Sequence, residues 1–386
     1  MYNNPDRSKK IIVVHLITAL DAGGAQVMLC NLLSKTNREK FEPIVISMVD
    51  RGIFGDRIAS LDVPLYTLGM DTGKSSIKFL WKLQGLLHQL KPDVIQSWMY
   101  HANIAAQLSQ LLSLTKVPVC WGIHHSIASL GSEKKLTIML IKLGVYLSHL
   151  TPKIVFVSRS SQQQHQALGY SARKSDVIPN GFDTSLFIPS PAARLALRAE
   201  LGLPEDVFLI GAIGRNHPMK DHANFIQAAA LLLAHHPKTH FLLIGSGLNN
   251  DNSTLVEQIE QLNIQDRVHL LGARNDISRL TAALDICSLS SAYGEAFPLV
   301  IGEAMSCGVP CVVTDVGDSA WIVGNTGRVV PPKNAPALAE AWQELIELDP
   351  QDREKLGKMA RKRVIEDFSL ESIVDRYEEV YESLAQ

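Results

Sequence analysis

"VFLIGAIGRNHPMKDHANFIQAAA" (residues 207–230) contains a short apolar run, a polar loop and a stretch with helical apolar spacing. The run 207–213 has the length of a buried strand, and Asp221 stands where a helix N-cap is expected. Strand–loop–helix units of this kind build parallel sheets that are covered by helices on both faces. This segment therefore predicts an α/β domain.

The same pattern recurs along nearly the whole chain. It fades after Asn180-Gly181 into a Pro-containing connector and restarts at residue 207, so we expect two domains, 1–185 and 186–366, followed by an amphipathic helix in 367–386. Ligands of such sheets bind at the carboxyl ends of the strands, which places the expected site in a cleft between the two domains. The strands are expected within residues 10–16, 43–49, 93–98, 118–123, 153–158, 176–179, 207–214, 240–247, 267–272, 286–291 and 311–315.

Composition limits the class of protein. Of the 386 residues 46% are hydrophobic and 20% charged, and none of the five cysteines forms a C-x-x-C pair, which is typical of a globular protein in a reducing cytosol. No apolar run has the length of a membrane span, and the apolar segment near the start is expected to be a buried strand. Residues 1–185 carry 20 Lys+Arg and 12 Asp+Glu, whereas residues 186–386 carry 17 and 27. This asymmetry indicates that the first half faces an anionic partner, unless the two surfaces simply differ in charge.

Two loops have the composition of phosphate sites. In "LDAGGAQVML" (20–29), Gly23 and Gly24 would let backbone amides approach an anion at a helix start, although a tight turn without a ligand also favours glycine. In the opening segment, Arg215 and Lys220 follow a strand end, where two cations can neutralise a diphosphate; ordinary surface cations are the alternative. No G-x-G-x-x-G motif occurs, which argues against a dinucleotide-binding dehydrogenase.

A pair of glutamates surrounds a third helix start. In "GEAFPLVIGEAM" (294–305), Pro298 is expected in the first helical turn, so Glu295 precedes the helix and Glu303 lies inside it. Carboxylates near the positive end of the helix dipole are expected to stay ionised and to accept hydrogen bonds from sugar hydroxyls. Both glutamates could equally be ordinary partners of the helix dipole, and the residues alone leave the two readings open.

A family resemblance connects these motifs. "GEAFPLVIGEAMSCGVPCVVTDVG" (294–317) resembles the Glu-x7-Glu signature of the family 4 retaining glycosyltransferases, and "GRNHPMKDH" (214–222) resembles their donor-phosphate motif. "DAGGAQ" (21–26) is similar to their N-terminal Gly-Gly loop, and "VIPNGFDTSLF" (177–187) to the segment that closes their first domain. The resemblance implies the GT-B fold, with two Rossmann-like domains facing a cleft and a last helix that packs back on the first, acceptor-side domain.

The resemblance also implies roles for single residues in the second, donor-side domain. Arg215 and Lys220 would hold the donor diphosphate, Glu295 the hexose hydroxyls and Glu303 the ribose.

Main-chain groups complete the implied site. Amides around Phe297 and Leu299 would border the donor, and Gly23 and Gly24 would approach its phosphate or the acceptor.

Three positions depart from the family pattern. Trp98 stands where many members have a histidine near the sugar, and His101 or the pair His124-His125 could replace it. Gln26 replaces a common glutamate of the Gly-Gly loop. Trp321 replaces a glutamate after the glycine turn at 317.

The implied reaction is transfer of a hexosyl group, with retention, from a nucleoside diphosphate sugar to an acceptor hydroxyl. The family's most common donor carries uridine, and its polysaccharide-building members suggest a saccharide or lipid-linked acceptor. No Asp-x-Asp occurs, so we expect no metal or other cofactor, and we expect no nucleic-acid partner. The alternatives are a sugar-nucleotide epimerase or glycogen-type phosphorylase of similar architecture and a non-catalytic nucleotide-binding scaffold protein.

One predicted helix bears on where in the cell the protein acts. Residues 132–153 combine four lysines, among them Lys134, Lys135 and Lys142, with nine apolar residues, most of which are expected to cover the sheet. The helix either has a basic outer face or docks on an anionic cytoplasmic leaflet. We therefore expect a cytoplasmic enzyme, with peripheral attachment to the inner face of the plasma membrane as the second reading.

Overall fold

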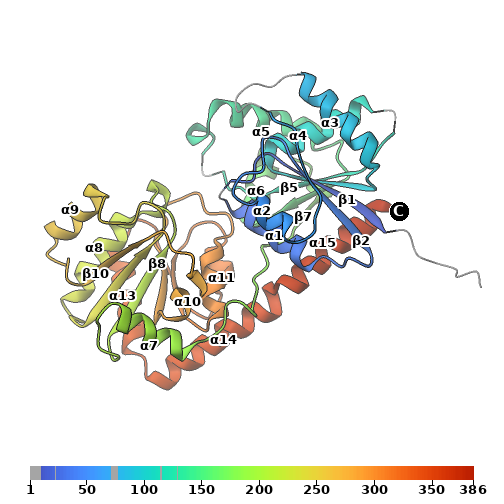
Figure 1. Cartoon of the computed structure of the whole chain (residues 1–386). Helices are drawn as coiled ribbons and strands as arrows, with labels where there is room; N and C mark the ends of the chain where they lie inside the picture. The colour runs from blue at the N-terminus through green and yellow to red at the C-terminus, as the bar shows by residue number, and fades with distance from the viewer. Residues whose placement is uncertain (1–9, 22, 71–76, 114, 128) are drawn as a thin grey trace, which may run out of the picture. The chain divides into compact units, whose positions relative to one another are not determined.

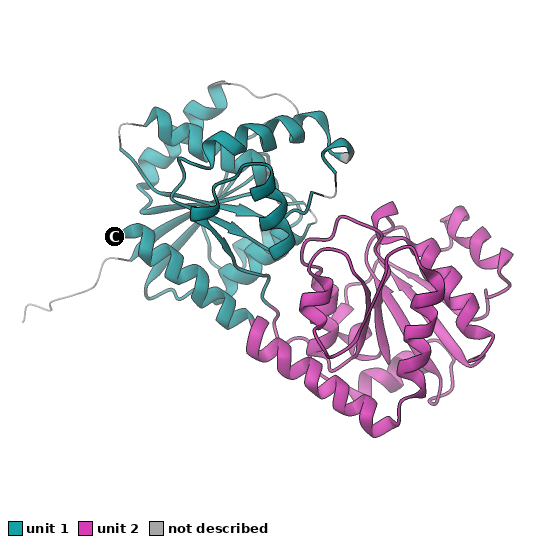
Figure 2. Cartoon of the chain, turned by 180° about the vertical axis from the view of Figure 1, so that it is seen from behind, with its two compact units in different colours: residues 1–181, 370–386 teal, residues 182–369 magenta. Residues whose placement is uncertain are grey.

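The computed structural model describes residues 10–21, 23–70, 77–113, 115–127 and 129–386 (Figure 1). The chain forms two compact units, residues 1–181 with 370–386 and residues 182–369 (Figure 2). In the described ranges, no helix combines the length and apolarity required to cross a membrane.

The first unit is built on a seven-stranded sheet in the order β3-β2-β1-β4-β5-β6-β7, and every pairing is parallel. The strand order reverses between β1 and β4, so the loops that follow these two strands diverge at a switch point. The strands are β1 Ile11–Ile17, β2 Phe41–Ser47, β3 Leu65–Thr67, β4 Val94–Trp98, β5 Val119–Ile123, β6 Lys153–Phe156 and β7 Ser175–Val177.

Helices cover both faces of this sheet. On one face pack α1 (Gly24–Lys35), α2 (Gly55–Ala59) and α15 (Leu370–Ala385), and on the other α3 (Ile77–Leu90), α4 (Met99–Leu112) and α5 (Lys135–Leu147). Helix α6 (Arg159–Ala167) adjoins β6 and β7. The apolar positions of α15 are buried against α1, β1 and β4, as their spacing predicts.

The second unit contains six parallel strands in the order β10-β9-β8-β11-β12-β13. They are β8 Phe208–Ile213, β9 Thr239–Ile244, β10 Val268–Gly272, β11 Ile286–Leu289, β12 Cys311–Thr314 and β13 Arg328–Val330. The helices are α7 Pro191–Glu200, α8 His222–Leu233, α9 Ser253–Gln261, α10 Ile277–Ala282, α11 Leu299–Ser306, α12 Ser319–Val323, α13 Ala335–Glu347 and α14 Pro350–Phe368. Two doubly wound parallel sheets, each with its own core, confirm the predicted fold class.

Helix α5 divides its apolar residues between the sheet and the surface. Of its apolar residues, Leu140, Ile141 and Leu147 are buried, but Leu136, Met139, Leu143 and Tyr146 are exposed. The exposed four are spaced by three or four residues and therefore line one outward face of the helix. Ile138 and Val145 are partly buried, so five of the nine apolar residues are at least partly covered.

Candidate functional site

The candidate donor site lies at the switch point of the second sheet. Strands β8 and β11 are neighbours there although they are far apart in the sequence. The segment that begins at Gly214 follows β8, and Ser290 and Ser291 follow β11. Open parallel sheets bind ligands at this position.

The loop after β8 is held in place by main-chain contacts. Gly214 N–H donates to Ile244 O at 2.9 Å, and Asn216 N–H donates to Ser246 O at 2.7 Å. Gly245 has φ +148, and a Cβ there would collide with Gly214 O, so glycine is required for this close approach. The main chain on both sides of Arg215 is thereby fixed.

Arg215 and Lys220 end up in different environments. The Arg215 side chain is exposed and has no partner among the described residues. Lys220 ends a short 3-10 turn, and Asp221 caps the next helix by accepting from Asn224 N–H at 3.3 Å, as predicted. No group of three or more His, Cys, Asp or Glu side chains in the described part of the chain is placed to hold a metal ion.

Lys220 and Glu295 form an ion pair. Lys220 Nζ lies 2.6 Å from Glu295 Oε1, and both side chains are largely shielded from solvent. The buried Ser291 hydroxyl donates to the same oxygen at 2.7 Å. With Oε1 engaged twice, Oε2 remains as the acceptor for a ligand hydroxyl. The family resemblance implies a phosphate role for Lys220 and a sugar role for Glu295, and the structure brings the two groups together.

Hydrogen bonds around this pair connect three strand ends. Ser290 Oγ donates to Lys220 O at 2.8 Å, and Thr314 Oγ1 donates to Ser291 O at 2.7 Å. Sequence reasoning missed Ser291 and Thr314, because isolated hydroxyl residues after strands carry no distinctive pattern.

The glycine turn after β12 packs against the main chain of Glu295 and Ala296. Gly317 has φ +60, and a Cβ there would collide with Glu295 O. Asp318 N–H donates to Ala296 O at 3.1 Å. The main chain of Glu295 is therefore fixed as firmly as its carboxylate.

The start of α11 is anchored by an aromatic cluster. Pro298 is its N-cap, and Leu299 begins the helix. Phe297 is buried, with ring centroids 6.0 Å from Phe182, 5.8 Å from Trp321 and 5.6 Å from Phe368. Phe297 thus positions the helix start, and Trp321 serves packing at the position where the family often has glutamate.

Glu303 is the fifth residue of α11, and its carboxyl has no partner among the described residues. Burial raises the pKa of Glu303 to about 7, from an ordinary value of 4.5. This corrects the expectation that the helix field keeps it ionised, because desolvation outweighs the dipole five residues into the helix.

The two glycines of the first unit lie at the start of α1. Gly23 is its extended N-cap, Gly24 its first residue, and both are exposed. Gln26 Nε2 donates to Ala19 O at 3.0 Å and braces the loop against the end of β1. An ionised glutamate could not donate this bond, so the substitution to glutamine fits its local role.

Trp98 ends β4 and is fully buried. Its ring stacks on His124 at 5.0 Å and on Tyr377 of α15 at 6.2 Å, and its Nε1–H points at His15 Nδ1 at 3.4 Å. Met99 follows with φ +70, an unusual conformation for a non-glycine residue, and α4 begins there without a loop. The first turn of α4 is thereby placed directly at the strand end.

The three candidate histidines differ in accessibility. Burial lowers the pKa of His124 to about 4, and a side-chain hydrogen bond with Asn180 offsets this shift only in part. His125 Nε2 lies 2.8 Å from Glu133 Oε1. His101, in the first turn of α4, is partly buried, which lowers its pKa, and it has no partner among the described residues. His101 is therefore the best placed of the three to meet a ligand.

Comparison with known proteins identifies the family. Residues 22–186 match the family model Glycosyltransferase Family 4, and residues 193–363 match Glycosyl transferases group 1. The chain is 26% identical over 312 residues, 79% of each chain, to the Escherichia coli UDP-Gal:alpha-D-GlcNAc-diphosphoundecaprenol alpha-1,3-galactosyltransferase. It is 28% identical over 281 residues to the Bacillus anthracis N-acetyl-alpha-D-glucosaminyl L-malate synthase. The aligned residues cover 72% of this chain and 71% of the synthase.

Solved structures agree in fold. Anabaena Alr3699/HepE in complex with UDP superposes with a TM-score of 0.86 at 24% identity, over 97% of this chain and 100% of that one. Its complex with UDP-glucose gives 0.83 at 25% identity with the same coverage. These matches confirm the GT-B fold. The two family models favour a transferase over an epimerase, a phosphorylase or a scaffold protein. The chain is a glycosyltransferase and belongs to family 4.

Proposed function

We propose that this glycosyltransferase moves a hexosyl group from a UDP-sugar to a hydroxyl of a lipid-linked saccharide, with retention of configuration. The observation that carries this proposal is the Lys220–Glu295 pair, in which a cation suited to phosphate and a carboxylate suited to sugar hydroxyls are fixed 2.6 Å apart at the switch point. The UDP-Gal and diphosphoundecaprenol in the name of the E. coli relative support this choice of donor and acceptor.

In the proposed reaction, the acceptor oxygen forms a bond to the anomeric carbon while the bond from that carbon to the UDP oxygen breaks. Attack occurs on the face that UDP leaves, and a departing phosphate oxygen takes the acceptor proton. Arg215 and Lys220 stabilise the negative charge that grows on the diphosphate, and the amides at the start of α11 add to this effect. Glu295 Oε2 holds a hexose hydroxyl, and Glu303 accepts from the ribose.

We further propose that transfer needs no divalent cation. The fixed charges of Arg215 and Lys220 supply the stabilisation that a bound metal otherwise gives a leaving diphosphate. Activity should therefore persist in excess EDTA, and loss of activity that added Mg²⁺ or Mn²⁺ restores would contradict this.

On the acceptor side, we propose that His101 contacts the sugar, and that Gly23 and Gly24 admit a phosphate or the acceptor to the start of α1. The exposed Lys134, Lys135 and Lys142 would bring the first unit to an anionic membrane, where a lipid-linked acceptor resides.

Product stereochemistry tests the proposal. The enzyme is incubated with UDP-galactose, UDP-glucose or UDP-N-acetylglucosamine and a prenyl-diphosphate saccharide, and the new linkage is analysed by NMR. An α-linked product from an α-linked donor is expected, with Lys220→Ala as the inactive control. A β-linked product would overturn retention.

A further inference from the structure

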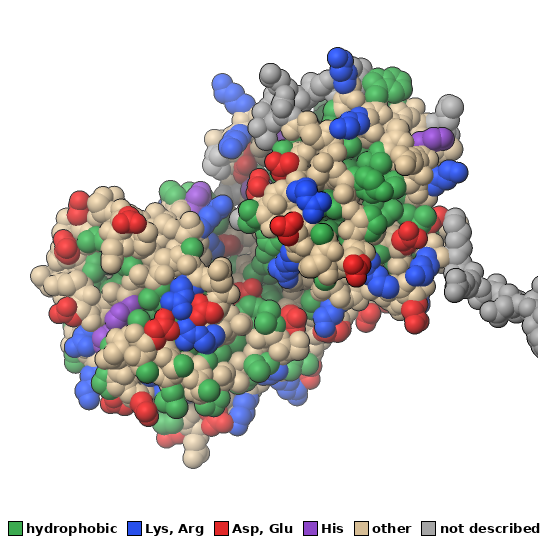
Figure 3. Space-filling model, in the orientation of Figure 1, with side chains coloured by type: hydrophobic (Ala, Val, Ile, Leu, Met, Phe, Trp, Pro, Cys, Tyr) green, Lys and Arg blue, Asp and Glu red, His purple; other side chains and the backbone are tan. Residues whose placement is uncertain are grey.

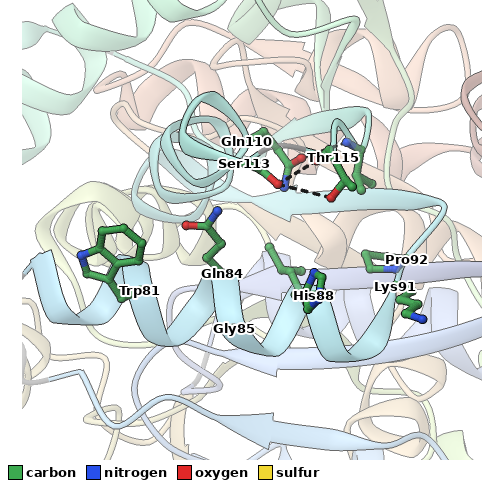
Figure 4. Close-up of a pocket in the computed structure, with 11 residues that line it drawn as sticks. Trp81, Gln84, Gly85, His88, Lys91, Pro92, Gln110, Ser113 and Thr115 are labelled. Atoms are coloured by element: carbon green, nitrogen blue, oxygen red, sulfur yellow. Dashed lines mark hydrogen bonds between the residues drawn. The ribbon is translucent and has the colours of Figure 1, made fainter.

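The first unit contains a cavity of about 700 Å³ between α3 and the end of α4 (Figure 4). None of the candidate site residues described above lines it. Figure 3 shows hydrophobic side chains on the surface of the first unit, in the region where Figure 1 places α3. The volume is that of a site for a small ligand. This space is called the α3–α4 cavity below.

Helix α3 turns an aromatic and polar side toward the α3–α4 cavity. Trp81, Gly85 and His88 are spaced by four and three residues, so they share one side of the helix (Figure 4). Trp81 is 64% exposed although it lines the cavity. Its flat ring is therefore available to a ligand.

Gly85 has no structural reason to be glycine. It lies in the interior of α3, where glycine destabilises a helix relative to alanine. A Cβ at this position would meet no other part of the protein within 4 Å. Neither packing nor backbone conformation requires glycine here. Its effect is to leave a gap between the side chains of Trp81 and His88, through which a ligand can approach the bare helix.

Neutral polar groups complete the wall of the cavity. Gln84 Nε2 donates to Leu112 O at 3.3 Å, and Gln84 Oε1 has no partner among the described residues. On the α4 side, Gln110 Oε1 accepts from Val117 N–H at 2.8 Å, and Gln110 Nε2 has no partner within the described ranges. The cavity thus offers an uncharged acceptor and an uncharged donor from opposite sides.

The charge distribution disfavours an anionic ligand. Helices α3 and α4 end beside the cavity, at Leu90 and Leu112, and helix C-termini carry partial negative charge. Lys116 Nζ donates to Gln110 O at 2.6 Å, so this nearby cation is already engaged by a carbonyl of the α4 end. Among the described lining residues, Lys91 is the only lysine or arginine, and none is a carboxylate.

We infer that the α3–α4 cavity binds a neutral saccharide. A pyranose ring lies over Gly85 with its C–H groups against the Trp81 ring, because the face of an aromatic ring carries partial negative charge. The sugar hydroxyls exchange hydrogen bonds with the amides of Gln84 and Gln110. A nucleotide would bring phosphates to two helix C-termini, and an acyl chain would leave these amides unpaired.

The cavity lies at the edge of the first sheet opposite to the substrate edge. Lys91 and Val117 precede β4 and β5, whereas His101 follows β4. Gln110 stands nine residues after His101 in α4, which is about 14 Å along the helix. A sugar bound here is therefore not the reacting one, and we assign the cavity to a distant sugar of a longer acceptor chain. This role rests on the proposed saccharide acceptor, whereas saccharide binding itself does not.

The fluorescence of Trp81 reports on occupancy. Of the five tryptophans, Trp98, Trp121 and Trp342 are at most 1% exposed and Trp321 is partly buried, so Trp81 is the most exposed. The full-length protein is titrated with galactose, N-acetylglucosamine, chitotetraose, cellotetraose and maltotetraose. We expect a saturable change of emission with at least one tetrasaccharide, and the affinity should not depend on salt because no ion pair is formed.

Gly85→Leu fills the cavity and keeps the reporter. It should weaken saccharide binding on the order of tenfold or more, since the leucine occupies the place of the sugar ring. Its Tm should not fall, because the new Cβ meets no other part of the protein and leucine favours a helix. Gln89→Leu, at an exposed site of α3 outside the cavity, is the matched control and should bind like the wild type. Trp81→Ala, followed by isothermal titration, should also bind the saccharide more weakly.

Transfer kinetics test the role in holding the acceptor. Binding of a distant sugar raises the effective concentration of the reacting end of the acceptor. In Gly85→Leu, the KM for a prenyl-diphosphate acceptor with several sugars should therefore rise with kcat unchanged, while the KM for an acceptor with one sugar stays the same. Unchanged KM values for both acceptors would overturn this role.

The remaining outcomes separate the site from the proposed function. Absence of a saturable emission change with every saccharide would overturn the site, and so would binding that Gly85→Leu leaves intact. An emission change with phosphatidylcholine vesicles but with no saccharide would overturn it in favour of an acyl chain. Saccharide binding that Gly85→Leu abolishes, in a protein that transfers sugar to neither acceptor, would support the site and count against the proposed function.

Discussion

The raised pKa of Glu303 predicts that ionisation of this residue lowers the stability of the folded protein at alkaline pH. Burial raises the pKa of this carboxyl from 4.5 to about 7 in the folded protein, so between these values the folded state holds a proton that the unfolded state has lost. Stability must therefore fall as pH rises through this window, and the full cost is present above pH 7.

Glu303→Gln measures this cost, because glutamine keeps the shape but never ionises. A shift of about 2.5 pKa units corresponds to on the order of 3 kcal/mol at pH 8 and roughly 1 kcal/mol at pH 5. The variant should accordingly gain about 2 kcal/mol relative to the wild type when the pH is raised from 5 to 8.

Urea unfolding at the two pH values, followed by tryptophan fluorescence, gives the difference directly. Glu340→Gln on α13, an exposed site, is the matched control and should change stability equally at both pH values. A Glu303→Gln effect that is independent of pH would refute the reasoning that burial raises this pKa.

The remaining predictions concern catalysis. Arg215→Ala should lower kcat/KM for the donor by on the order of 100-fold without loss of stability, because its side chain has no partner among the described residues; equal rates would sink its phosphate role. Glu295→Ala should depress kcat more than UDP affinity, since it contacts the reacting sugar; a selective loss of UDP binding would reassign it. Ser291→Ala should lower kcat, with the donor KM and the UDP affinity unchanged, because it removes one of the two contacts that hold Glu295 Oε1; threonine should restore part of the rate, and wild-type turnover in the alanine variant would show that the hydroxyl does not position Glu295.

Long, strongly apolar strands were predictable from the sequence, whereas two short ones were not. Strands β3 (Leu65–Thr67) and β13 (Arg328–Val330) have three residues each and lie at sheet edges. Three residues are too few to show a period, so pairing with the neighbouring strand determines them. The equally short edge strand β7 (Ser175–Val177) was expected within 176–179, where Val177 and Ile178 stand together.

The sequence motifs predicted the local parts of the candidate site but not the contacts between distant residues. The glycine-rich turns and the Asp221 cap follow from local backbone chemistry, and the structure places them as expected. The Lys220–Glu295 contact joins residues 75 positions apart and depends on β8 lying beside β11, which spacing along the chain does not reveal. The protonation of Glu303 and the exposed row of α5 likewise depend on what packs around each residue.

Isothermal titration of UDP tests the central claim, that the switch point of the second unit binds the donor diphosphate through Arg215 and Lys220. We predict that Glu295→Ala binds UDP at least as tightly as the wild type, because UDP lacks the sugar that Glu295 is proposed to hold, and loss of the ion pair leaves Lys220 available to the diphosphate. The Arg215→Ala/Lys220→Ala variant should bind UDP at least about tenfold more weakly, since two charge-assisted contacts are lost. Undiminished affinity in that double variant, with a folded structure confirmed by circular dichroism, would contradict the account.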